Sequence, residues 1–357
     1  MENQFQADCY PLLIGSLPME DHAEASGLVF KYTPEIPLWV QLPVHAQERM
    51  IPQFMPGLPG LVHRDGRDFI DTSAADFEEQ LLGFYEEYMA VIEGNLDPSE
   101  SRFVFRTGEV QGLGVLLQHL KSVPTPPVAV KGQVTGPFTF CTGVHDENRN
   151  AIFYNEQLRD AAIKLLALKA RWQVRRLATV GCPVIIFCDE PALAGYGTSE
   201  FISISRDEVM ASLVEVIDAI HAEGGLAGVH VCANTDWSLI LDSPVDIVNF
   251  DAYSYFDRFI LYPDLIKKFI DAGKILAWGI VPTGDTGDIE KETAESLIAQ
   301  WNEKAQAIED LGIDRSIIMS QSLITPSCGA GSLPIVLAHK VVRLTREVSD
   351  AIRSSAG

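Results

Sequence analysis

Short apolar runs alternate with longer amphipathic stretches along most of the chain, a pattern typical of parallel strands joined by helices. Strands are predicted at residues 128–136, 183–190, 226–233, 245–253, 275–282 and 316–322. Helical spacing of apolar residues predicts helices at residues 156–181, 207–225, 259–274, 289–313 and 334–357, with a short helical turn at 238–243. Six strands, each followed by a helical segment, imply a parallel α/β sheet.

Two further strands are predicted near the N-terminus, at residues 11–18 and 36–43. The total of eight is that of a closed (β/α)8 or TIM barrel, and a doubly wound open sheet is the alternative. No GxGxxG sequence follows the first strand, which disfavours the dinucleotide-binding form of the open sheet. Residues 46–127 lack a regular pattern and are interpreted as an irregular insertion over the barrel mouth. No linker or repeat divides the chain, so residues 1–357 are predicted to form one catalytic domain.

Composition excludes several classes of function. Hydrophobic residues make up 47% of the 357 residues and charged residues 21%, which suits a globular enzyme with a large core. The net charge of -22 is repelled by phosphates, so we expect no nucleic acid and no anionic membrane surface as partner.

The sequence also bears on the compartment. We see no signal peptide and no apolar run long enough to span a bilayer. The six cysteines are sparse and irregularly spaced, which indicates a reducing, cytoplasmic environment rather than a disulfide framework.

Three residues in the strand pattern suggest metal chemistry. His230 and Cys232 are two positions apart on a predicted strand, so their side chains point the same way, and Cys328 lies in the glycine-rich SLITPSCGAG. All three fall near predicted strand ends, where barrel enzymes place functional groups. One imidazole and two thiolates suit Zn²⁺, and three protein ligands with an open position are typical of a catalytic zinc. The alternative is a chance HxC pair with cysteines that pack as small apolar residues.

The sequences HVCANTDW (230–237), PSCGAG (326–331) and DEPAL (189–193) resemble the cobalamin-independent methionine synthase superfamily. That superfamily includes corrinoid-dependent methyltransferases and uroporphyrinogen decarboxylase. The resemblance extends from IGSLP (14–18) to the last predicted helix. It matches the C-terminal catalytic barrel of methionine synthase, without the N-terminal barrel of the long enzymes.

The resemblance implies a barrel that transfers a methyl group to a thiol activated by zinc. His230, Cys232 and Cys328 match the zinc ligands of the family. Asp251 stands where the methionine synthases have a glutamate ligand, but aspartate is shorter, and a carboxylate that caps a loop is the alternative.

The resemblance also implies a binding site for an amino acid. Asp189 matches the aspartate that holds the amino group of homocysteine, and Glu190 beside it is a second candidate for a catalytic or a supporting role. Gly15 and Ser16 match the segment near the amino-acid carboxylate. WVQLPVHAQE lacks the His-Gly-Glu pattern of the family, and Gln41 is the candidate in its place.

The sequence departs from the long methionine synthases after its seventh predicted strand. They carry a histidine there that is thought to protonate the leaving folate, and AWGIVPTGD (277–285) has none. A methyl group on a folate nitrogen needs an acid in order to leave, whereas a methyl group on cobalt does not. A methyl-corrinoid protein is therefore a candidate donor beside methyl-folate.

The resulting hypothesis is a zinc-dependent thiol methyltransferase that converts homocysteine to methionine. A corrinoid-linked enzyme acting on another thiol, such as coenzyme M, and a non-catalytic barrel that binds a metal or a tetrapyrrole remain alternatives. Uroporphyrinogen decarboxylase itself fits poorly, because GSLPMEDHAE (15–24) lacks the arginines that bind its polycarboxylate substrate.

Overall fold

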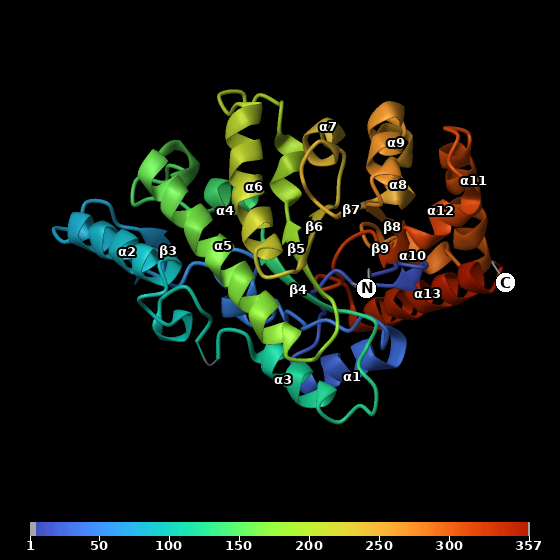
Figure 1. Ribbon diagram of the computed structural model, residues 1–357, viewed down its shortest axis with the longest axis horizontal. Coiled ribbons are helices and arrows are strands. Elements are labelled where there is room, and N and C mark those ends of the chain that lie inside the picture. Colours follow the sequence, from blue (N-terminus) through green and yellow to red (C-terminus); the bar gives the residue numbers. More distant parts are fainter. Residues whose placement is uncertain (1–4, 107, 356–357) are drawn as a thin grey trace.

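The computed structural model describes residues 5–106 and 108–355. The chain folds around a curled, seven-stranded sheet in the order β1-β9-β8-β7-β6-β5-β4, and every strand pair in it is parallel (Figure 1). The strands are β1 (Tyr10–Pro11), β4 (Val130–Thr135), β5 (Val184–Asp189), β6 (Leu226–Val231), β7 (Ile247–Phe250), β8 (Ile275–Val281) and β9 (Ser322–Pro326). The predicted parallel α/β class is confirmed.

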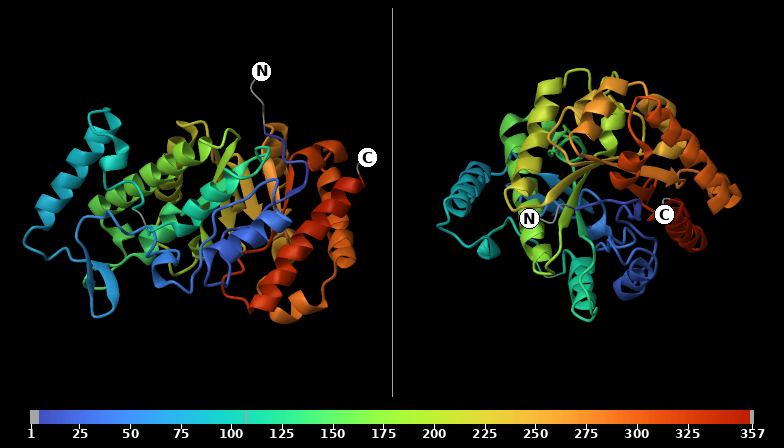
Figure 2. Two further views of the ribbon diagram at one scale, coloured as in Figure 1. Left: turned by 90° about the horizontal axis from the view of Figure 1, so that it is seen from below. Right: turned by 45° about the vertical axis from the view of Figure 1, so that its right-hand side comes forward.

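Helices lie around the outside of the curled sheet (Figure 2), as parallel strands require crossover connections that pass over a sheet face. The longer helices are α1 (His22–Tyr32), α5 (Glu156–Ala178), α6 (Arg206–His221), α9 (Pro263–Asp271), α11 (Ala294–Glu309) and α13 (Ile335–Ser354). Shorter ones follow several strands: α4 (Pro137–Gly143), α7 (Trp237–Leu241), α8 (Ala252–Phe259), α10 (Thr286–Lys291) and α12 (Arg315–Ser320).

Alternate strand positions face two different cores, because successive side chains of a strand point to opposite faces. On β5, Ile186 and Cys188 belong to the large core beneath the helices, whereas Ile185 and Phe187 belong to a smaller cluster. That smaller cluster also holds Leu12, Ile36, Ile247, Ala277 and Leu323, which come from segments all round the sheet. The inner face of the curl is therefore packed with side chains.

The two early strands are shorter than predicted. Residues 11–18 contribute only β1 to the sheet, and residues 36–43 form two isolated parallel bridges, Leu38 with Lys131 and Gln41 with Ser16. Prolines 11, 18, 37 and 43 have no N–H to donate, so a continuous ladder cannot form there.

Hydrogen bonds nevertheless connect the two edges of the sheet through residues 36–43. Gln41 N donates to Gly15 O at 3.1 Å, and Lys131 N donates to Pro37 O at 2.9 Å. Buried side chains add to these contacts, because Lys131 Nζ donates to Ile14 O and Gln133 Nε2 donates to Trp39 O. Residues 36–43 thus lie between residues 14–16 and β4 and are hydrogen-bonded to both.

The predicted strand at residues 316–322 is wrong. Residues Arg315–Ser320 form α12, and the strand is β9, which begins at Ser322. Of the apolar run Ile317, Ile318 and Met319, only Ile318 is fully buried, so the run has one inward face and suits a helix. All five residues of β9 are buried, as expected of a strand covered on both faces.

One predicted helix and one predicted strand are interrupted at capping residues. The helix predicted at 289–313 divides into α10 and α11, because Thr293 begins α11 with a capping box in which Thr293 and Ser296 bond to each other's backbone N–H. The predicted strand at 245–253 ends at Phe250, and Asp251 caps α8.

The region at residues 46–127 is more regular than predicted. It contains the hairpin β2 (Leu61–Arg64) and β3 (Arg67–Ile70), and the helices α2 (Phe77–Ile92) and α3 (Gln111–Leu120). Figure 1 shows α2 at the end of the molecule opposite to the C-terminal helices. Within residues 5–106 and 108–355, no helix is long and apolar enough to cross a membrane.

Candidate metal centre

The three predicted metal ligands come together at the carboxyl end of the sheet. His230 is near the end of β6, Cys232 follows that strand directly, and Cys328 follows β9. A ring nitrogen of His230 and the two sulfur atoms lie within 4.8 Å of one another. Since β7 and β8 separate β6 from β9 in the sheet, the curl of the sheet is what allows these side chains to meet.

Asn249 on β7 sets the orientation and tautomer of His230. Its Nδ2 donates to the backbone oxygen of Ala277 and to Thr325 Oγ1, both at 2.8 Å. The amide oxygen of Asn249 therefore faces His230 and accepts a hydrogen bond from Nδ1. With its proton on Nδ1, the ring presents the lone pair of Nε2, which is buried and has no hydrogen-bond partner among the described residues.

The pKa values of the two cysteine thiols shift in opposite directions. Contact with Cys328 and with His230 lowers the pKa of Cys232, against the opposing effect of burial. The contact between the two cysteines, burial and the charge of Cys232 raise the pKa of Cys328. A cation bound between the two sulfurs would favour the thiolate form of both.

Asp189, at the end of β5, lies beside the three ligands. Burial raises the pKa of its carboxyl, while His230 and Lys131 lower it. Its Oδ1 is buried and has no hydrogen-bond partner among the described residues. An ammonium group is a partner of the right charge for this free oxygen.

Asp251 and Glu190 act on neighbouring helices. Asp251 Oδ1 accepts from Ser254 N at 2.8 Å and caps α8, and burial raises the pKa of Asp251 to about 6. The carboxylate of Glu190 accepts from Phe138 N, Thr139 N and Thr139 Oγ1 at the start of α4, at 2.9, 2.8 and 2.6 Å. Burial raises the pKa of Glu190 to about 7, although these hydrogen bonds oppose the rise.

A cavity of about 320 Å³ opens over the centre and brings most of the predicted residues together. It is lined by Gly15, Ser16, Gln41, Asp189, His230, Cys232 and Cys328. Asp251 and Glu190 are not part of this lining. A cavity of this size holds a small molecule such as an amino acid.

Several lining residues were not predicted from the sequence, among them Glu48, Arg49 and Met50. Glu48 is only 1% exposed, accepts from Leu42 N at 2.9 Å and lies 2.8 Å from His22 Nε2. The only signal for it in the sequence is a carboxylate shortly after the second predicted strand.

The segment that carries Gly15 and Ser16 is held in place by close contacts with the glycines that follow Cys328. Ser16 Oγ accepts a hydrogen bond from Gly331 N at 3.2 Å, and a Cβ atom at Gly329 would lie 2.2 Å from Ser16 Oγ. The glycines after Cys328 are thus required for the close approach of the first and last strands.

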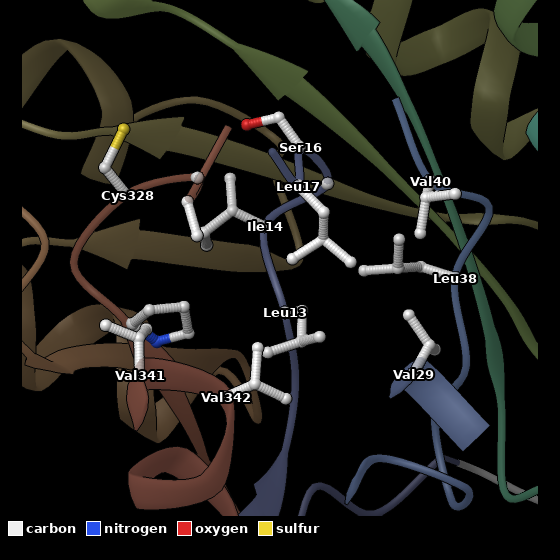
Figure 3. A pocket seen from close by; sticks show the side chains of 14 residues that line it. Leu13, Ile14, Ser16, Leu17, Val29, Leu38, Val40, Cys328, Val341 and Val342 are labelled. Carbon is white, nitrogen blue, oxygen red and sulfur yellow. The ribbon is translucent and has the colours of Figure 1, made fainter. Parts of the chain in front are cut away.

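An apolar pocket lies directly beneath Ser16 and Cys328 (Figure 3). It is lined mainly by aliphatic side chains: Leu13, Ile14, Leu17, Val29, Leu38, Val40, Val341 and Val342. These side chains offer no polar partner, so the pocket suits the packing of residues 13–17 against α1 and α13. The polar chemistry is confined to the metal-centre cavity.

No protein-family model matches the chain, and a search of curated proteins finds no match either. The chemical interpretation of this centre therefore depends on the arrangement of its own side chains.

Proposed function

We propose that the chain is a zinc-dependent methyltransferase that transfers a methyl group to a thiol, with homocysteine as the favoured acceptor and methionine as the product. One observation carries the proposal: the buried, unpartnered Nε2 of His230 stands with the sulfurs of Cys232 and Cys328 in a group whose ligand atoms lie within 4.8 Å.

The donor set fits zinc. One imidazole nitrogen and two sulfurs leave a coordination position for a substrate, and a bound cation would favour the thiolate form of both sulfurs. When bound, zinc supplies a Lewis acid that lowers the pKa of a substrate thiol and makes it a nucleophile near neutral pH. Asn249 keeps the His230 ring in the orientation that this requires.

Residues around the cavity favour an amino acid as the thiol. Asp189 offers a buried carboxylate oxygen without a partner, which suits the ammonium group of homocysteine. Ser16 lies on the cavity wall, and its hydroxyl, which accepts from Gly331 N, can donate its own proton to the carboxylate end. With both ends held, the sulfur would be presented to the centre in one orientation. A thiol without an ammonium group, such as coenzyme M, would leave Asp189 unpaired.

The donor remains one of two classes, a methyl-corrinoid protein or methyl-folate. The residues that follow β8 include Pro282 and Thr283, and Thr283 Oγ1 bonds to Ser327 Oγ at 2.9 Å. No histidine stands in this segment to protonate a leaving folate nitrogen. This favours a methyl-corrinoid, whose methyl group leaves without a proton.

We further propose that the curled sheet is a closed eight-stranded barrel, in which residues 36–43 serve as the second strand. The bridges from Leu38 to Lys131 and from Gln41 to Ser16 support this proposal, as does the cluster of side chains that fills the inner face.

The first test is the zinc content of purified wild type, Cys328→Ser and Cys182→Ser. We expect about one zinc per chain in wild type, none in Cys328→Ser and an unchanged content in Cys182→Ser, whose half-buried thiol lies outside the centre. Wild type that stays free of zinc after reduction and loading would overturn the proposal.

The second test is methyl transfer to homocysteine or coenzyme M from methylcobalamin or methyl-tetrahydrofolate. We expect the zinc-loaded protein to prefer homocysteine and methylcobalamin. Activity with methyl-tetrahydrofolate alone would contradict the corrinoid donor, and preference for coenzyme M would contradict the role of Asp189.

A further inference from the structure

A second groove, of about 960 Å³, opens next to the metal-centre cavity. Arg49 lines both of them, so the two spaces adjoin at this residue. Its walls are residues 46–56, the β2–β3 hairpin and the turn at residues 143–149. We call it the arginine groove, after Arg49, Arg67 and Arg149 in its lining.

The arginine groove is positive on a strongly negative protein. All three of its arginines are exposed, and none takes part in the salt bridges found among the described residues. The one acidic residue in the lining, Asp68, is hydrogen-bonded to His63 at 2.8 Å. On a chain with a net charge of -22, the lining of this groove thus carries three arginines without carboxylate partners against one acidic side chain, a local excess of cationic groups.

Carboxylates close to the groove are already engaged elsewhere. Asp71 pairs with Arg64 at 2.8 Å, and Glu147 accepts from Thr72 N at 2.9 Å. Asp146 accepts from the backbone N–H groups of residues 148 and 150, both at 2.8 Å. None of these carboxylates pairs with an arginine of the arginine groove; Arg49 Nε donates to Pro43 O at 3.2 Å, and the other nitrogen atoms of its guanidinium group make no hydrogen bond among the described residues.

The backbone of the groove is held in a fixed shape. The hairpin turns at Asp65 and Gly66, both with positive φ, and Ile70 N ties the hairpin to His145 O at 3.0 Å. Arg149 itself has φ of 68°, in a turn closed by its N–H to Asp146 O at 3.1 Å. A left-handed backbone at a non-glycine residue persists where the surrounding contacts determine it, and such residues concentrate at functional sites.

We propose that the arginine groove binds the anionic part of the second substrate, through carboxylate or phosphate groups. Guanidinium groups match both chemistries with paired hydrogen bonds. A donor held there, with Arg49 at the boundary, would extend its reactive end into the cavity that contains Cys232 and Cys328. The assignment of the ligand as the methyl donor rests on the proposed function, whereas anion binding by the groove does not.

The test is calorimetric binding of citrate and of tripolyphosphate at low ionic strength. The proteins are wild type, R67Q/R149N, R67K/R149K and the control R176Q. Arg176 is exposed, makes no salt bridge among the described residues and is not part of the groove lining. Asparagine is chosen at position 149 because it tolerates positive φ. Zinc content is measured on the same samples.

We expect wild type and R176Q to bind at least one of the two anions equally, and R67Q/R149N to bind it about tenfold more weakly or worse. R67K/R149K should keep part of the affinity because it keeps the charge. A preference for citrate or for tripolyphosphate then identifies carboxylate or phosphate as the ligand group.

Two results would overturn the inference: no binding of either anion to wild type, or equal affinity of R67Q/R149N and wild type. Failure of the proposed function is a separate result, because it would appear as missing zinc in protein that still binds the anion. In that case the groove would remain an anion site and its assignment to a methyl donor would be withdrawn.

Discussion

At the scale of single residues, Asn249 is decisive for the candidate centre although it would not touch the metal. Its side chain is completely buried and satisfied by three partners on three strands: His230, Ala277 and Thr325. That network determines which nitrogen of His230 is free. Neighbours that orient a metal-binding histidine commonly change metal affinity by 10- to 100-fold when they are removed.

We therefore predict that Asn249→Ala lowers zinc affinity by roughly 10- to 100-fold, as measured by competition with a chromogenic chelator. The matched control is Asn234→Ala, an exposed asparagine shortly after Cys232, for which we expect an unchanged affinity. Thermal unfolding of both variants separates loss of the ligand geometry from loss of the fold. Equal affinity in Asn249→Ala and wild type would remove Asn249 from the centre.

At the scale of elements, side chains from strand ends hold the helices that surround the cavity. Glu190 follows β5 and binds the start of α4, and Asp251 follows β7 and caps α8. At the amino ends of the strands, His221 in the last turn of α6 lies 2.7 Å from Asp246, which also accepts from Ala227 N. These contacts fix the helices relative to the strands that carry the centre.

Gly136 leaves the space that Glu190 needs to reach α4. A Cβ atom at position 136 would lie 2.2 Å from Cδ of Glu190, so we predict that Gly136→Ala destabilises the protein by about 1–3 kcal/mol, measured by denaturant unfolding. Gly114→Ala is the control, because no atom lies within 4 Å of a Cβ atom there and alanine favours the helix. Unfolding free energies of both variants equal to that of wild type would contradict this role of Gly136.

The contact of His221 with Asp246 predicts a pH dependence of stability. The hydrogen bond to Asp246 raises the pKa of His221 above its ordinary value of 6.5, although burial opposes the rise. Since the folded state binds the proton more tightly, this contribution is complete below pH 6.5 and is lost as the pH rises through the folded-state pKa. The unfolding free energy of His221→Gln should therefore not fall over this pH range. That of His339→Gln, in which an exposed histidine is replaced, should fall as it does in wild type.

At the scale of the whole molecule, the first and last parts of the chain meet at the site. β1 pairs with β9, and Ser16 contacts the glycines that follow Cys328. The proposed barrel closes through residues 36–43, which carry Gln41 into the cavity wall. Closure of the barrel would therefore fix the position of Gln41 in the cavity wall as well as complete the sheet.

If the barrel is closed, the backbone amides of Leu17 and Gln41 should exchange with solvent deuterium as slowly as those of β4. Leu17 N donates to Gln41 O at 3.0 Å, and Gln41 N donates to Gly15 O at 3.1 Å. Exchange of both amides at the rate of the exposed hairpin turn at Asp65 would indicate an open edge.

Much of the architecture was predictable from local pattern. Apolar runs placed β5, β6 and β8 within a residue or two, because strands covered on both faces leave a strong signal, and β4 was placed as closely although it contains Lys131 and Gln133. The pattern misplaced β9, since Ile317–Met319 is as apolar as a strand although it lies in α12, where only Ile318 is fully buried. The regular structure within residues 46–127 was missed because its helices pack on distant parts of the chain.

The sequence by itself determined the order of strands and helices and the chemistry of the three candidate ligands, because local periodicity and residue type contain that information. Only the tertiary structure decided which groups meet: the partner of His230 on β7, the cavity position of Glu48, and the convergence of Arg49, Arg67 and Arg149 on one groove. These contacts join residues far apart in the chain, and they depend on the curl of the sheet and on the path of its loops, which no local pattern specifies.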